Sequence, residues 1–142
     1  MIKLKAQISI DFLIALTLIT ITAVNLISLG LSQMKDAETF DTSSKLKVFA
    51  IDVRDTVAKV YSSGRGFKIR KSWPFNLGPG DNITIALQTP GMLNITAFIG
   101  GEKYIVIEKL QVPITQNTSV ILQINSPDFW IENDGGSIRV EK

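Results

Sequence analysis

The feature that most constrains this chain is a long apolar stretch near its first residues. Residues 12–31 include no charged side chain, and the only charges before them are Lys3, Lys5 and Asp11. A helix of about 24 residues rises ~36 Å, enough to cross a hydrocarbon core of ~30 Å. The lysines are expected to stay on the cytoplasmic side, so the residues after the stretch would lie outside the cell. The sequence therefore predicts contact with a membrane through residues 8–31.

A short polar motif stands at the entrance of this stretch. Gln7, Ser9, Asp11 and Phe12 follow Lys5 with the spacing Gln-x-Ser-x-Asp-Phe. A carboxylate inside a membrane helix costs about 3 kcal/mol even on the lenient insertion scales, less near the interface, and usually marks a functional pairing. With lysines before it and an apolar helix after it, the motif resembles the class III signal peptide of archaeal type IV pilins. That family usually has Glu where this chain has Asp11, so the charge is kept on a shorter side chain.

The resemblance implies a processing step. In that family a prepilin peptidase cuts directly before the Gln, which here places the cut between Ala6 and Gln7 on the cytoplasmic side. Residues 1–6 would be a basic leader, and the helix would survive cleavage as the core of a filament. The amine released on Gln7 would pair with Asp11 of a neighbouring subunit and align the subunits.

The resemblance also implies a function. The expected protein is a structural subunit, major or minor, of an archaeal type IV pilus-like filament that serves in adhesion. It would reside in the membrane as a precursor and then in an extracellular filament on the cell surface. The implied partners are further copies of itself in a homopolymer, other pilins, the prepilin peptidase, and the pilus assembly ATPase with its membrane platform.

Other interpretations of the same stretch remain open. It would also suit a plain signal anchor, or a secretory signal peptide in which Ser28-Leu29-Gly30 replaces a clean cleavage site. A further alternative is a membrane-anchored accessory protein of the archaellum or cell surface, whose β domain binds a surface-layer or motor partner. The native amino-terminus distinguishes them: Gln7 for a pilin, Met1 for an anchored protein, and a residue near Leu31 for a secreted domain.

The helical pattern continues beyond the apolar stretch. Within the stretch, Asn25 needs a hydrogen-bond partner, and Gly30 predicts a bend or a melted turn. Residues 32–63 are amphipathic, with an expected interruption or fresh N-cap at residues 41–44. Gly64 predicts the end of the helix. The apolar positions recur at three- and four-residue steps: Leu46, Phe49, Ala50, Val53, Val57, Val60 and Tyr61.

The rest of the chain has the period of β-strands. Alternating segments separated by Gly and Pro turns predict strands at residues 67–70, 83–87, 92–99, 103–108, 119–125, 129–132 and 137–141. The sequence therefore predicts an α+β fold, in which a long helix over residues 7–63 packs on an antiparallel β-sandwich-like head. The predicted division is a leader over residues 1–6, the helix over 7–63, and an extracellular head domain over 64–142.

Composition excludes several classes of function. The chain has no Cys and no His, which removes disulfides, thiolate nucleophiles, histidine bases and the commonest zinc ligands. No nucleotide-binding or hydrolase motif is present either, so we expect neither an enzyme nor a bound cofactor. The net charge of +2 equals the two lysines of the predicted leader. We therefore expect a neutral mature chain that packs densely and does not bind nucleic acid.

The sequence contains one cluster of basic residues and one of acidic residues, and each allows both a structural and a functional interpretation. The basic cluster fits the outer face of an edge strand, or a site for an anionic glycan, lipid or DNA. The acidic cluster fits a solvated hairpin tip, or a cation site. The basic residues are Arg65, Lys68, Arg70 and Lys71, and the acidic ones are Asp128, Glu132 and Asp134.

Three sequons lie in the segment predicted to be outside the cell. Asn82, Asn94 and Asn117 each begin an Asn-x-Ser/Thr triplet. N-linked glycans there would shield the surface of a filament and stabilise a domain without cysteines. The alternative is unmodified Thr- and Ser-rich strand sequence.

Overall fold

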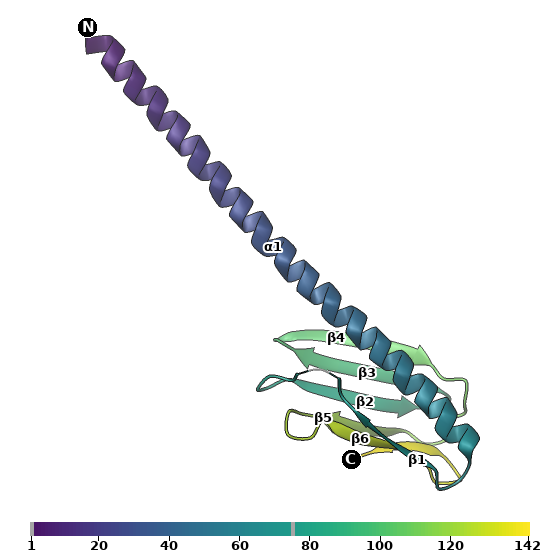
Figure 1. Ribbon diagram of the computed structural model, residues 1–142. Helices are drawn as coiled ribbons and strands as arrows, with labels where there is room; N and C mark the ends of the chain where they lie inside the picture. Colours follow the sequence, from purple (N-terminus) through teal and green to yellow (C-terminus); the bar gives the residue numbers. More distant parts are fainter. Residues whose placement is uncertain (1, 75) are drawn as a thin grey trace. The chain divides into compact units, whose positions relative to one another are not determined.

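The computed structural model describes residues 2–74 and 76–142, with only the backbone described for residues 2–8. In this part of the chain one helix is followed by seven strands (Figure 1). The elements are α1 (Ile2–Ser63), β1 (Lys68–Ser72), β2 (Asn82–Gln88), β3 (Met92–Ile99), β4 (Glu102–Lys109), β5 (Thr118–Leu122), β6 (Asp128–Asn133) and β7 (Ile138–Glu141). The chain divides into two compact units, Met1–Thr42 and Ser43–Lys142.

The described part of the first unit is helical throughout. The hydroxyls of Thr17, Thr20 and Thr22 donate hydrogen bonds to the carbonyls four residues earlier, each at 2.8 Å. These polar groups are therefore satisfied within the helix and can stand in an apolar medium at little cost.

Helix α1 has neither of the two breaks expected from the sequence. It runs without interruption through Gly30 and through residues 41–44. A single Gly costs a helix only about 1 kcal/mol, and Asp, Thr and Ser cost less. Because the helix contains no Pro, each added residue still gains its backbone hydrogen bond, and propagation outweighs these small penalties.

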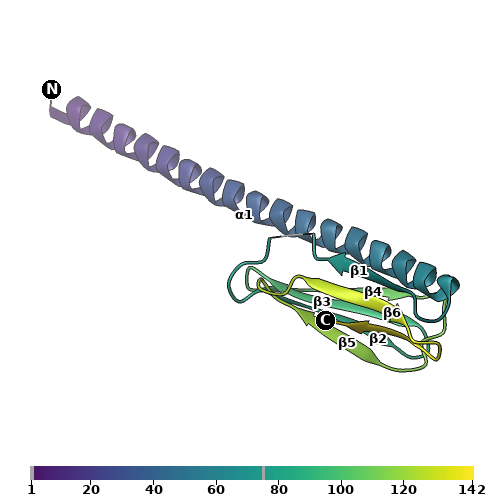
Figure 2. The ribbon, with the colours of Figure 1, turned by 60° about the horizontal axis from the view of Figure 1, so that its bottom comes forward.

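The second unit contains two antiparallel sheets that form a sandwich-like head (Figure 2). The three-stranded sheet has the order β1-β6-β7, and the four-stranded sheet has the order β4-β3-β2-β5. Residues alternate between buried and outward-facing positions, as along β2. The α+β class and the sandwich-like head predicted from the sequence are confirmed.

The core of the head is built from both sheets and from the part of α1 that belongs to this unit. Six of the seven helical side chains predicted to form one face are buried, with Phe49 at 4% exposure and Val53 and Val57 at 0%. The prediction is wrong for Tyr61, which lies in the last turn of the helix and is 47% exposed. Phe49 meets Trp73 edge to face at 4.8 Å between ring centroids, and Phe129 at 6.3 Å. The sheets contribute Ile83, Ile85, Leu87, Leu93, Ile95, Ala97, Leu122, Phe129, Ile131, Ile138 and Val140. The helix is thus an integral wall of the core.

Turn residues end the elements largely where the sequence indicates. Gly64 has a φ of 89° and donates to the carbonyl of Tyr61 at 3.3 Å, so it ends the helix as predicted. Strand β5 ends at Leu122, earlier than the predicted residue 125. The chain reverses there in a tight turn in which Gln123 and Ser126 form an isolated bridge. Asn, Ser and Pro residues favour such a turn over a continued strand.

Candidate functional sites

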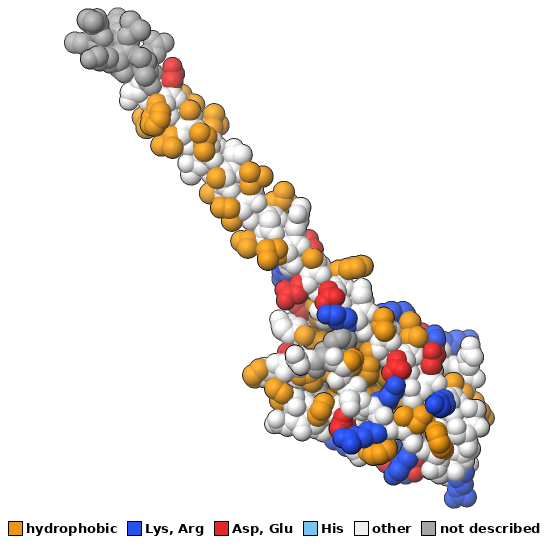
Figure 3. All heavy atoms as spheres, in the orientation of Figure 1, with side chains coloured by type: hydrophobic (Ala, Val, Ile, Leu, Met, Phe, Trp, Pro, Cys, Tyr) orange, Lys and Arg blue, Asp and Glu red, His pale blue; other side chains and the backbone are white. Residues whose placement is uncertain are grey.

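The first candidate site is the apolar surface of α1. Every described side chain from Ser9 to Leu31 is exposed, including Phe12 at 65% and Leu31 at 64%. Hydrophobic side chains are visible along this part of the helix in Figure 3. By length and composition, α1 is the one helix among the described residues that is able to cross a membrane, with a mean hydropathy of 2.3 in its most apolar window. Its place near the amino-terminus also suits a signal sequence.

The motif that predicts processing lies at the start of this helix. The backbone of Ala6 and Gln7 belongs to α1, but their side chains and that of Lys5 lie outside the described residues. Ser9 and Asp11 stand on the exposed helix surface, and Asp11 makes no ion pair or hydrogen bond with any described residue. The cleavage before Gln7 stays a prediction.

The basic cluster is not one continuous face. Lys68 and Arg70 point outward from β1, where Lys68 lies 5.0 Å from the centre of the Trp130 ring and Arg70 pairs with Asp128. The side chain of Lys71 points to the other side of β1, because successive side chains in a strand alternate between its two faces. It forms an ion pair with Asp52 of α1 at 2.6 Å.

Arg65 does not belong to the same face either. It precedes β1, in the turn that follows the helix. The predicted outer face of an edge strand is therefore confirmed for Lys68 and Arg70, since β1 is the edge of its sheet, and is wrong for Lys71. Lys68, Arg70 and Lys71 each engage a partner within the head.

The three acidic residues are also engaged within the head. Hydrogen bonds from Ser72 and then Arg70 hold the pKa of Asp128 below its ordinary value of 3.8. Arg139, at 3.1 Å, lowers the pKa of Glu132. No group of three carboxylates suited to a metal ion occurs among the described residues.

Asp134 closes the hairpin between β6 and β7. The backbone N–H groups of Gly136 and Ser137, each at 3.0 Å, lower the pKa of Asp134. The hairpin-tip interpretation therefore holds for Asp134 alone, because Asp128 begins β6 and Glu132 lies within it.

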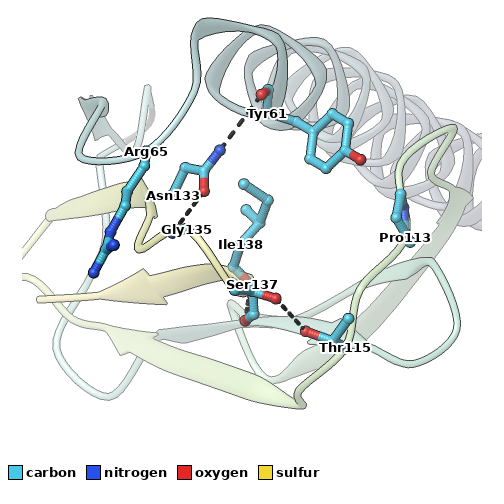
Figure 4. Close-up of a pocket in the computed structure, with 9 residues that line it drawn as sticks. Tyr61, Arg65, Pro113, Thr115, Asn133, Gly135, Ser137 and Ile138 are labelled. Carbon is cyan, nitrogen blue, oxygen red and sulfur yellow. Dashed lines mark hydrogen bonds between the residues drawn. The ribbon is translucent and has the colours of Figure 1, made fainter.

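A hollow of about 360 Å³ lies between the end of α1 and this hairpin (Figure 4). The side chain of Asn133 donates to the carbonyl of Tyr61 at 3.4 Å and accepts the N–H of Gly135 at 2.9 Å. The hydroxyl of Thr115 donates to the carbonyl of Gly136 at 2.9 Å. Asn133 thus holds the hairpin to the end of the helix, and Thr115 holds it to the loop before β5, so the polar groups of the hollow have a structural role. Sequence analysis missed it, since its members are far apart in the chain.

The three sequons lie at one sheet. Asn82 on β2 and Asn94 on β3 occupy half-buried positions facing away from the core, whereas Asn117 is exposed in the loop before β5. The side-chain oxygen of Asn117 accepts the N–H of Thr89 at 2.8 Å. Asn82 and Asn94 therefore have their side chains on the outer face of the four-stranded sheet, which a glycan can reach.

The same outer face has apolar side chains that the sequence analysis did not single out. Ile105 and Ile107 on β4 are 54% and 53% exposed, and Ile121 on β5 is 51% exposed. Ile107 lies directly across from Asn94. The sequence does indicate this exposure. β4 is apolar at successive positions, but a strand in a sheet with only one face on the core can bury only every second side chain.

The chain was compared with protein-family models, curated proteins and solved structures, and none of them matches it.

Proposed function

We propose that this protein is a structural subunit of a type IV pilus-like surface filament that polymerises through α1. The observation that carries the proposal is that one uninterrupted helix serves two roles. Its residues from Ser9 to Leu31 are mostly apolar and all exposed, and its residues from Ser43 onward form a wall of the β-rich head. A subunit with such a helix can leave the membrane and bury its apolar part against copies of itself.

The carboxylate of Asp11 supports the same proposal. It stands beside the apolar residues with no partner among the described side chains. In an apolar filament core an unpaired carboxylate is costly, and a neighbouring amine would relieve that cost. Cleavage between Ala6 and Gln7 would supply the amine, and prepilin peptidase with the assembly ATPase and platform would supply the machinery.

The decisive experiment determines the amino-terminus of the native protein. Mass spectrometry is applied to the membrane fraction and to filaments sheared from the cell surface. A chain that begins at Gln7 and occurs in the sheared fraction supports the proposal. A chain that begins at Met1 and stays in the membrane contradicts it.

A second candidate is a membrane-anchored accessory protein whose head binds a surface-layer or motor partner. The observation that favours it is the exposed outer face with Ile105, Ile107 and Ile121, since exposed apolar patches mark interaction sites. This protein would keep Met1 and would be absent from filaments, so the same experiment separates the two candidates.

N-glycosylation belongs to the proposal as a surface feature. Glycans on Asn82 and Asn94 would cover the outer face of the four-stranded sheet. The intact mass of the native protein tests this: a mass equal to the bare polypeptide rules it out, and loss of the added mass in Asn94→Gln supports it.

A further inference from the structure

Asp11 and Asn25, two polar side chains of the apolar helix that have no described partner, lie along one line of the helix. Asp11 and Asn25 are separated by two heptads, and the alternating steps of four and three residues between them place them on one seam of the helix. The members of this seam are Asp11, Ala15, Leu18, Thr22, Asn25 and Leu29. The seam therefore has the spacing with which one helix packs along another.

Asn25 differs from the threonines of the same helix. Thr17, Thr20 and Thr22 satisfy their side chains on their own backbone. The carboxamide of Asn25 is exposed and has no hydrogen bond to any described residue. A carboxamide in an apolar medium without a partner costs several kcal/mol, and lipid tails offer neither a donor nor an acceptor.

The chemistry of Asn25 indicates which partner fits. A carboxamide has both a donor and an acceptor, so an identical Asn at the same depth satisfies both sides. Copies of one chain insert in the same orientation, which places Asn25 of one copy opposite Asn25 of the next in a parallel pair. The same register brings the two Asp11 carboxylates toward each other at the membrane entrance, so the helices must diverge there and the close contact is confined to residues 15–29. Leu18 and Leu29 stand one heptad or less away on the same seam and would pack around this contact.

We infer that the chain self-associates in the membrane through this seam, with Asn25 hydrogen-bonded to Asn25 of a second copy. The occupant of the helix face is a second copy of this chain. The association precedes cleavage and filament formation, because it needs only inserted helices. It therefore goes beyond the proposed function and stands or falls separately from it.

The test uses the absence of cysteine from the chain. Single cysteines are placed on the seam by Thr22→Cys and Leu29→Cys, and at similar depth on the opposite side of the helix by Val24→Cys and Ile27→Cys. The full-length protein is reconstituted in lipid vesicles at several protein-to-lipid ratios and oxidised. Disulfide-linked dimers are expected for the two seam variants, while the two opposite-side variants stay monomeric.

A second set of variants isolates the hydrogen bond. In the Thr22→Cys background, Asn25→Leu is expected to lower the dimer yield about fivefold at limiting protein, the factor for one interhelical hydrogen bond of about 1 kcal/mol. Asn25→Gln keeps donor and acceptor and should retain most of the yield. Equal cross-linking on both sides of the helix, no cross-linking at any position, or an unchanged yield in Asn25→Leu would each overturn the inference.

The outcome can be distinguished from failure of the filament proposal. The vesicles contain no peptidase, so the cross-linking result does not depend on cleavage before Gln7. Seam-specific dimers from a protein whose native amino-terminus is Met1 would keep this inference and reject the filament. A native amino-terminus at Gln7 without seam-specific dimers would support the filament and reject this inference.

Discussion

Lys71 on β1 forms an ion pair with Asp52 on α1, with 2.6 Å between the ammonium nitrogen and a carboxylate oxygen. Its strand neighbours Lys68 and Arg70 point to the other side of the same strand. The pair joins the edge of the three-stranded sheet to the helix. It shows that one of the four clustered basic residues serves the internal attachment of the helix.

The contribution of this ion pair to stability should be small. The side chains of Lys71 and Asp52 are 23% and 53% exposed, so water screens their attraction. A double-mutant cycle with Lys71→Ala and Asp52→Ala, measured by thermal unfolding of the full chain in detergent, is expected to give a coupling below about 1 kcal/mol. A coupling well above about 1 kcal/mol would contradict this expectation and mean that water does not screen the pair.

Glu108 should matter more than Lys71. It lies on β4 with an 11% exposed side chain and pairs with both Lys47 and Arg54 of α1, the latter at 3.4 Å. Glu108→Ala removes a nearly buried carboxylate that accepts charge-assisted hydrogen bonds from both cations, and is expected to lower the free energy of unfolding by about 1–3 kcal/mol. The neighbouring Lys109→Ala, at an exposed position, should change it by less than about 0.5 kcal/mol. Similar effects of the two variants would contradict the geometry.

The burial of Phe49 gives the largest expected loss of stability. Phe49 is 4% exposed and packs on Trp73 and Phe129. Phe49→Ala should cost about 3–5 kcal/mol of unfolding free energy, because it removes ring contacts and leaves a cavity. Val48→Ala is the matched control, since Val48 is 67% exposed and should be nearly neutral. A stable Phe49→Ala variant would show that the helix is not part of the head core.

Acid should weaken the head through Asp128. Its pKa is held below 3.8 by Ser72 and Arg70, so its contribution is present above the unfolded-state pKa and is lost as the pH falls through the folded-state value. The difference in unfolding midpoint between wild type and Asp128→Asn should therefore be constant near neutral pH and shrink below 3.8. A difference that persists undiminished in acid would mean that the carboxylate charge is not what stabilises the site.

Asp11 should affect assembly more than processing. In the proposed filament, Asp11→Ala removes the partner of the Gln7 amine, so we expect cleaved subunits that accumulate in the membrane and few sheared filaments. Asp11→Glu keeps the charge and should assemble. The measurement compares the sheared and membrane fractions by mass spectrometry and immunoblot. Normal filament yield from Asp11→Ala would remove the assigned role of the carboxylate.

Much of the fold follows from periodicity. The three- and four-residue steps from Leu46 to Val60 define the buried helix face, and alternation locates the strands to within a few residues. The exceptions have local causes. Helix α1 continues through Gly30 because one Gly lowers helix stability only slightly. Strand β5 ends early because the residues after it favour a turn over a continued strand.

The sequence by itself determined the apolar helix, the amphipathic face, the strands, the lack of Cys and His, and the seam that unites Asp11 with Asn25. These are properties of neighbouring residues, and a regular backbone repeat is sufficient to place them. Only the tertiary structure decided that Lys71 meets Asp52, that Glu108 meets Lys47 and Arg54, and that Asn133 binds the end of the helix. Such contacts join residues many positions apart, so they depend on strand register and on how the sheets and the helix stack.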